Sequence, residues 1–416
     1  MNYRSKEMRK ESKKTKIGKQ RGITLVALVI TIIIIIILAT VTINMAFGDN
    51  GLIKQAELAR DLTANSTIAE QEGMNSLLSD FANLMADDSG TTQPGGNTEQ
   101  GGDTEPEEPK VPSTTEEAKP TPGEDGPEFT DTTPITDDEG NTVVIPGGFH
   151  LDADSGTAVE DGIVIEDSSG NQFVWIPVGT YQTSSGSKTN NLSRRTFSST
   201  GATEVSGDDG ITDNSGFTFY GEGHPWAWAE AKDTIEAFKT SSTTNGGFYI
   251  GRYEAGTDSE RTDKNVALTT PLVQANKYPY IEVTRYQANK QAKAMYSENS
   301  YVKSELISSY AWDTALNFIC QTNSAGYTLA TTTNDTYGNF GRRQNTGVYS
   351  ADNYSNIHDL LGNCAEWTTE YSNHDNNPCV MRGGGDISIS YAADRNDESE
   401  SYSYDIFSFR IQLYIK

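Results

Sequence analysis

The stretch NIHDLLGNCAEWT, residues 356–368, gathers reactive residue types around a Gly-Asn turn. Asp359, Cys364 and Glu366 could serve an active site or a metal site. Trp367, in contrast, is a large residue of the kind that a folded domain tends to bury. A structural hairpin is therefore the third interpretation. What the rest of the chain places near this stretch decides among the three.

Segments with strand and helix patterns surround this stretch. β-branched and aromatic residues between Gly, Asn and Ser turns predict strands within residues 141–149, 161–181, 246–256 and 407–416. Apolar residues at helical spacing predict helices within residues 224–241, 284–296 and 308–319. Thr284 is a possible N-cap of the second helix. Because the order is mixed and lacks a βαβ rhythm, the pattern favours an α+β fold.

The N-terminal part of the chain has the features of a membrane anchor. Residues 1–22 are rich in Lys and Arg, which predicts a basic cytoplasmic leader. Residues 23–47 contain no charged side chain, and as a helix they are long enough to cross a hydrocarbon core of about 30 Å. We therefore expect a single-pass protein of the cell membrane whose C-terminal domain is extracellular.

Two further segments separate this anchor from the strand-rich region. Residues 48–87 have patchy helical spacing and are predicted to form a helical stalk. Residues 88–132 are mostly Pro, Gly, Thr and Glu, and so few apolar groups cannot offset the chain entropy of folding. We predict a disordered acidic linker here. The formal net charge of the whole chain is −26, which argues against a nucleic-acid partner.

The junction KQRGITLVALVITIII, residues 19–34, resembles a type IV prepilin leader. The resemblance implies cleavage between Gly22 and Ile23. Ala27 occupies the fifth mature position, where pilins usually have a Glu that pairs with the amine of a neighbouring subunit. A plain membrane anchor and a pilin-like subunit of a cell-surface assembly, with other pilin-like subunits as partners, both remain open.

Six motifs follow one another in the C-terminal region: FVWIPVG, GGFYIGRYEAG, SSYAWDTALNFI, NIHDLLGNCAEWT, MRGGG and FRIQLYIK. The ordered set resembles the formylglycine-generating enzyme (sulfatase-modifying factor) family over residues 133–416. The resemblance implies a C-type-lectin-like fold for this domain. It also implies a pair of catalytic cysteines just after the Arg-Gly-Gly motif, but residues 382–410 contain no Cys. Serine cannot replace a redox-active thiol, so we expect that the domain is not an enzyme.

The same resemblance implies a structural Ca²⁺ site in the 356–368 stretch. Its ligands would be the carboxylates of Asp359 and Glu366 and the carbonyl oxygens of Gly362 and Cys364. Such a set of oxygen atoms at a tight turn suits Ca²⁺. The alternative is a hairpin without metal, in which Trp367 is buried and Glu366 is hydrogen-bonded to the backbone.

Residues 386–408 are the candidate binding segment, with six Ser, four Asp and three Tyr but no Lys. Tyr and Ser provide amphipathic contact area and adaptable hydrogen bonds, as in antibody paratopes. Variable proteins of diversity-generating retroelements, which include relatives of the family, resemble this arrangement of a fixed scaffold with a polar C-terminal segment. A polar loop without a ligand is the alternative. The predicted ligand-binding residues are Asp386, Ser388, Ser390, Tyr391, Asp394, Asn396, Asp397, Ser399, Tyr402, Tyr404 and Asp405.

These features together predict a surface-displayed, membrane-anchored recognition protein that binds an extracellular protein or glycan. A minor pilin-like structural subunit is the alternative, and a formylglycine-generating oxidase is the least favoured. The three cysteines, Cys320, Cys364 and Cys379, are too few for a disulfide scaffold. Cys364 and Cys379 are close enough in sequence to pair, and three buried thiols are the alternative.

Overall fold

The computed structural model describes residues 123–416 except 214–215, 226–228, 333–342 and 385–390. These residues belong to one compact unit that spans residues 108–416. The predicted leader with its Gly22–Ile23 cleavage site, the membrane helix and the stalk lie outside the described residues. Within the described part of the chain, no helix is both long and apolar enough to cross a membrane.

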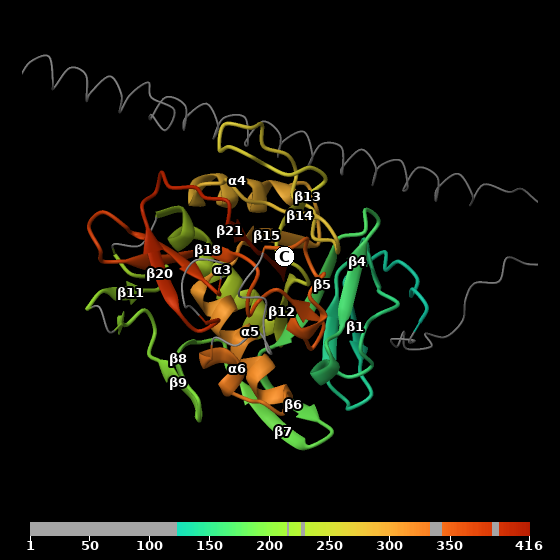
Figure 1. The fold of residues 1–416 in the computed structure, drawn as a ribbon. Helices are drawn as coiled ribbons and strands as arrows, with labels where there is room; N and C mark the ends of the chain where they lie inside the picture. Colours follow the sequence, from blue (N-terminus) through green and yellow to red (C-terminus); the bar gives the residue numbers. More distant parts are fainter. Residues whose placement is uncertain (1–122, 214–215, 226–228, 333–342, 385–390) are drawn as a thin grey trace, which may run out of the picture. The chain divides into compact units, whose positions relative to one another are not determined.

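A six-stranded antiparallel sheet, called here the first sheet, forms the centre of the domain (Figure 1). Its strands, in spatial order, are β15 (Val302–Leu306), β22 (Ile411–Ile415), β12 (Gly247–Gly251), β5 (Gln172–Pro177), β4 (Val164–Asp167) and β3 (Phe149–Leu151). Successive residues of a strand face opposite sides of a sheet. Every residue of β12 and β22 is buried, so both faces of the sheet are covered at its centre.

Helices cover this sheet. They are α3 (Ala229–Thr244), which contacts β12 and β22, α4 (Arg285–Met295), which contacts β15, and α5 (Ser309–Thr322), which contacts β5; the short α6 (Thr328–Thr331) follows α5. The Thr284 hydroxyl accepts a hydrogen bond from Gln287 N, and the Gln287 side chain accepts one from Thr284 N, which completes a capping box. The predicted N-cap is therefore confirmed. The helix predicted at 308–319 extends to Thr322.

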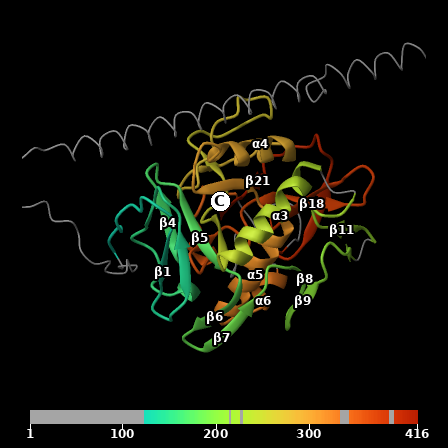
Figure 2. The ribbon, with the colours of Figure 1, turned by 180° about the vertical axis from the view of Figure 1, so that it is seen from behind.

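The second sheet contains the end of the 356–368 stretch, from Ala365 on, and two strands of the candidate binding segment. Its order is β10 (Ile211–Thr212), β11 (Thr218–Tyr220), β18 (Ala365–Ser372), β19 (Cys379–Arg382) and β20 (Arg395–Glu398), with β21 (Phe407–Phe409) parallel to β18. From both directions, β20 and β11 lie on the side of the domain opposite β1 and β4 (Figure 2). The second sheet thus forms one flank of the molecule.

Five two-stranded hairpins and two 3-10 turns complete the described elements. The hairpins are β1 (Thr133–Thr136) with β2 (Thr142–Ile145), β6 (Gly179–Thr183) with β7 (Gly186–Asn190), β8 (Arg194–Ser198) with β9 (Gly201–Val205), β13 (Gly256–Thr257) with β14 (Tyr278–Pro279), and β16 (Asn353–Tyr354) with β17 (Ile357–His358). The turns are η1 (Val159–Asp161) and η2 (Ser350–Asp352). The domain is mostly sheet with few helices, which agrees with the predicted α+β class.

The end of the predicted linker is in contact with the domain. Gly126 N donates a hydrogen bond to Leu151 O, and Phe129 N donates one to Phe149 O, so residues 126–129 run beside β3.

All three cysteines are buried and free, so Cys364 and Cys379 form no disulfide. Burial raises the pKa of Cys320 to about 12 and that of Cys379 to about 11.

Candidate functional site

Glu366 forms a buried ion pair at the start of β18. Arg410 Nη2 and Nε donate to the two carboxylate oxygens of Glu366 at 2.6 and 3.0 Å. Arg410 also donates to the carbonyl oxygens of Gly251 and His358, at 2.8 and 2.9 Å. A bidentate, charge-assisted pair of this kind is strong and fixes its geometry. Glu366 therefore links the second sheet to β12, through Arg410 rather than through the backbone.

Asp359 and Asn363 form the turn that precedes β18. Both adopt positive φ, 62° and 66°, a conformation that Asp and Asn tolerate better than most residues. Asp359 Oδ2 accepts a hydrogen bond from Gly347 N at 2.7 Å, and burial raises the pKa of Asp359 to about 7. Asn363 Nδ2 donates to Glu254, whose pKa burial and the neighbouring Asp359 charge raise well above its ordinary value. Sequence reasoning did not identify Glu254 as part of this cluster.

These contacts bear on the predicted Ca²⁺ ligands. The two carboxylates, Asp359 and Glu366, are buried, as are Gly362 and Cys364. Both carboxylate oxygens of Glu366 accept hydrogen bonds from Arg410. A Ca²⁺ ion would need these same oxygens as ligands, and the positive charge of Arg410 would repel it. No group of three or more His, Cys, Asp or Glu in the described part of the chain is arranged to hold a metal ion. The residue set fits an arginine-centred ion pair better than a Ca²⁺ site, and Ca²⁺ binding stays a prediction.

The 356–368 stretch is not a hairpin, because β17 pairs with β16 whereas β18 pairs with β11, β19 and β21. Trp367 lies in β18 and is buried, as expected for a core residue. Its side chain is fully buried, its Nε1 donates to Val283 O at 2.9 Å, and its ring meets that of Phe407 edge to face at 5.5 Å. Phe407 lies in β21, directly beside β18. The tryptophan therefore packs the start of β18 against the strand that ends the candidate binding segment.

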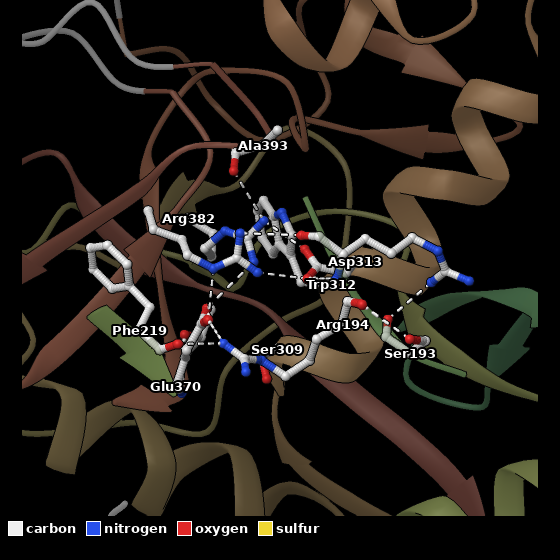
Figure 3. Close-up of polar contacts among 12 residues, drawn as sticks. Ser193, Arg194, Phe219, Ser309, Trp312, Asp313, Glu370, Arg382 and Ala393 are labelled. Atoms are coloured by element: carbon white, nitrogen blue, oxygen red, sulfur yellow. Dashed lines mark hydrogen bonds and ion pairs between the residues drawn. The ribbon is translucent and has the colours of Figure 1, made fainter. Parts of the chain in front are cut away.

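A second buried charge network lies farther along β18 (Figure 3). Glu370 accepts from Arg194 at 2.7 Å and from Arg395 at 2.7 Å. Asp313, on α5, accepts from Arg382 at 2.7 Å and from Arg395 at 2.6 Å. Although burial opposes ionisation, these arginines lower the pKa values of both acids. The network ties β8, α5, β18, β19 and β20 together, so it holds β20, a strand within the candidate binding segment.

A cavity of about 540 Å³ opens on the second sheet, and we call it the β20 cavity. Its described lining residues are Asp213, Phe217, Phe219, Ala365, Met381, Arg395, Asn396, Asp397, Glu398, Tyr402, Tyr404, Ile406 and Phe407. Four predicted ligand-binding residues are among them: Asn396, Asp397, Tyr402 and Tyr404. The structure thus gathers part of the predicted set around one hollow.

The other predicted ligand-binding residues have different positions. Asp386, Ser388 and Ser390 lie outside the described residues, and Tyr391, Asp394, Ser399 and Asp405 are not in the cavity lining. Asp394 Oδ2 accepts from Tyr391 N at 3.1 Å, which forms a local turn. Asp405 lies 3.8 Å from Arg343 in an ion pair.

Two exposed tyrosines stand at the cavity. Tyr402 and Tyr404 are each 40% exposed, and their rings lie 6.2 Å apart and are inclined by only 16°. Both rings also contact Phe407, at 5.7 and 6.0 Å between centroids. Since Phe407 is buried, it supports the pair from below. Neighbouring aromatic rings of this kind offer a large contact area at low entropic cost.

The strand register assigns the polar residues of β20 to two faces. Asn396 pairs with Met381 and Glu398 pairs with Cys379, so Asn396 and Glu398 lie on the Met381 face of the sheet. Asp397 lies on the opposite face, where Ser372 Oγ donates to it at 2.6 Å and His374 Nδ1 lies 3.3 Å away. Burial, followed by the Asp397 charge, raises the pKa of Glu398.

Sequence reasoning missed the contribution of the β10–β11 hairpin. Phe219 reaches the cavity because β11 pairs with the end of β18, with Phe219 opposite Ser372. Phe217 stacks on His374 at 4.0 Å between ring centroids. The hairpin is a short Gly-, Asp- and Thr-rich segment that ends at Tyr220, far along the chain from its partner strand, which begins at Ala365. No local pattern in the sequence predicts the pairing of β11 with β18.

Comparison with known proteins gave structural neighbours only. No family model matches the chain, and no curated protein matches it. PvdO from Pseudomonas aeruginosa is similar with a TM-score of 0.32 and 12% identity, over 60% of this chain and 97% of that one. CarF is similar with a TM-score of 0.28 and 11% identity, over 58% and 98%. Variable protein 1 of Treponema denticola is similar with a TM-score of 0.27 and 10% identity, over 58% and 95%.

Proposed function

We propose that the domain is a recognition module that binds an extracellular protein or glycan at the β20 cavity. The observation that carries the proposal is the cavity itself, because it unites Tyr402, Tyr404 and Asn396 of the predicted segment with Phe217 of a distant hairpin. Its volume of about 540 Å³ lies in the range of small-ligand pockets. It is also large enough to receive an anchoring side chain or a sugar ring.

The surroundings of the cavity support this proposal. Binding sites work best on rigid elements whose side chains are held by an outer layer of contacts. Arg395, at the start of β20, is held by Asp313 and Glu370, and Phe407 supports the two tyrosines. The site therefore combines a braced strand with exposed aromatic rings. The six ordered sequence motifs support the further proposal that this scaffold is C-type-lectin-like.

We infer a role without catalysis. A redox or nucleophilic cysteine needs an accessible thiolate. Burial raises the pKa of Cys379 to about 11 and that of Cys364 well above its ordinary value. Both thiols are therefore protonated near neutral pH, which supports binding over formylglycine generation. We further propose display at the cell surface through residues 23–47, on the strength of their sequence pattern.

Removal of the paired tyrosines tests the proposed function. The full-length chain and the double variant Tyr402→Ala, Tyr404→Ala are each immobilised and exposed to cell-surface protein extracts and to a glycan array. We expect the double variant to capture about tenfold less ligand than the wild type, because exposed aromatic anchors contribute much of the binding energy of an interface. Their thermal unfolding is compared to show that both proteins are folded.

Tyr278→Ala is the matched control. Tyr278 is 41% exposed, close to the value for the two cavity tyrosines, but it lies in β14 and does not line the cavity. The control should capture as much ligand as the wild type. Equal capture by the double variant and the wild type would show that ligands bind elsewhere.

A further inference from the structure

We infer that the β20 cavity recognises a basic side chain, Lys or Arg, presented by a protein or peptide. This inference rests on the proposed function and specifies its ligand. Four features carry it: the signs of the charges in the lining, the direction of Glu398, the paired tyrosine rings, and the net charge of the chain.

The lining has an excess of negative charge. Asp213, Asp397 and Glu398 line the cavity, and Arg395 is the one basic residue among its described lining residues. The Arg395 side chain is only 5% exposed, and its guanidinium forms ion pairs with Asp313 at 2.6 Å and Glu370 at 2.7 Å. The Arg395 guanidinium is therefore paired inside the protein. A ligand at the cavity meets carboxylates without a matching surface cation from Arg395.

Glu398 is the carboxylate best placed to meet a ligand. The register sets Glu398 on the same sheet face as Asn396 and Met381, which both line the cavity. Asp397 also lines the cavity, but its carboxylate already accepts a hydrogen bond from Ser372 Oγ and lies 3.3 Å from His374 Nδ1. Asp397 repels the negative charge of Glu398, whereas His374 would attract it when protonated. An incoming cation would relieve this repulsion.

The tyrosine pair completes a cation site. A Lys ammonium or Arg guanidinium is attracted to the face of an aromatic ring within about 6 Å of its centroid. Tyr402 and Tyr404 present nearly parallel, partly exposed rings, and Phe407 keeps them in place. A long basic side chain can therefore lay its methylene groups against a ring while its charged end approaches Glu398.

The net charge of the chain favours the same class of ligand. With a formal charge of −26, the protein attracts cations and repels anionic ligands over several ångströms. A neutral glycan would gain nothing from this field and would leave the Glu398 carboxylate without an opposite charge. A basic peptide segment uses the field, the carboxylate and the rings together, so a protein partner is favoured over a glycan.

A peptide selection tests the inference. A random-peptide phage library is panned on the immobilised full-length chain, and the strongest selected peptide is synthesised and titrated by fluorescence anisotropy. We expect enrichment of Lys and Arg and binding that weakens as salt is raised. Glu398→Gln should raise Kd about tenfold. Glu139→Gln removes the same charge from an exposed position in the turn that follows β1, and β1 lies on the side of the domain opposite β20 (Figure 1). This variant should leave Kd unchanged.

The outcomes separate this inference from the proposed function. Selected peptides without Lys or Arg enrichment that still need Tyr402 and Tyr404 would overturn the cationic ligand and support the site. Peptides that bind Tyr402→Ala, Tyr404→Ala as well as they bind the wild type would overturn both. If no peptide is selected and the glycan array captures a neutral sugar through the tyrosines, the basic side chain is excluded and the binding role remains.

Discussion

Glu366 and Glu398 lie in the same sheet, each near aromatic residues, and differ in what surrounds their charge. Glu366 is fully buried, and both of its oxygens accept from Arg410. Glu398 is partly exposed beside Asp397 and lines an open cavity. The first carboxylate is paired with an arginine inside the scaffold, whereas the second faces an open cavity. Residue type is the same in both places, so pairing and burial distinguish the structural site from the candidate binding site.

The aromatic neighbours follow the same division. Trp367 is fully buried and uses its indole N–H to bind Val283 O. Tyr402 and Tyr404, in contrast, are exposed residues. The 356–368 stretch thus has the composition of an active site but the contacts of a core. The segment after β20 contains the exposed groups.

The largest expected effect comes from the buried network that braces β20. Glu370→Gln removes the negative charge shared by Arg194, Arg382 and Arg395 and leaves these buried guanidinium groups undercompensated. Breaking a buried ion pair at one partner costs about 3–5 kcal/mol. We expect that loss in the free energy of unfolding measured by chemical denaturation. Glu139→Gln, at an exposed position, is the control, and equal stability of both variants would show that the network contributes nothing to the scaffold.

A smaller effect distinguishes the turn before β18. Burial raises the pKa of Asp359 from 3.8 to about 7, so the folded state binds this proton more tightly than the unfolded state does. Its contribution to stability is therefore complete below about pH 4 and is lost as the pH rises through about 7. Asp359→Asn carries no such charge, and Asn tolerates the positive φ of this position.

We therefore expect Asp359→Asn to flatten the decline in stability between pH 5 and pH 8, and to stabilise the protein at pH 8 by on the order of 2 kcal/mol. Chemical denaturation of both proteins at the two pH values measures this difference. A parallel pH dependence of wild type and variant would show that Asp359 is ionised in the folded protein throughout this range.

The sequence predicted what depends on local pattern and missed what depends on distant pairing. The helix at α4 was predictable because Thr284 and Gln287 form a capping box within four residues. The exposed tyrosines were predictable because Tyr402 and Tyr404 stand in a polar segment. The cavity wall at Phe219 was not predictable, since it depends on the pairing of β11 with β18. Buried arginines such as Arg382 also escaped notice, because a charged residue in a sequence usually belongs to the surface.

The smallest expected effect concerns Ca²⁺ at the 356–368 stretch. Arg410 already neutralises Glu366. We therefore expect the melting temperatures of the wild type in Ca²⁺ and in chelator to differ by less than about 2 °C. If Ca²⁺ instead binds there, its removal lowers the melting temperature by about 5 °C or more, and Asp359→Ala with Glu366→Ala abolishes the difference. That result would require Arg410 to release Glu366, and it would make the stretch a metal site. Identical melting in both solutions leaves it a buried turn held by an arginine.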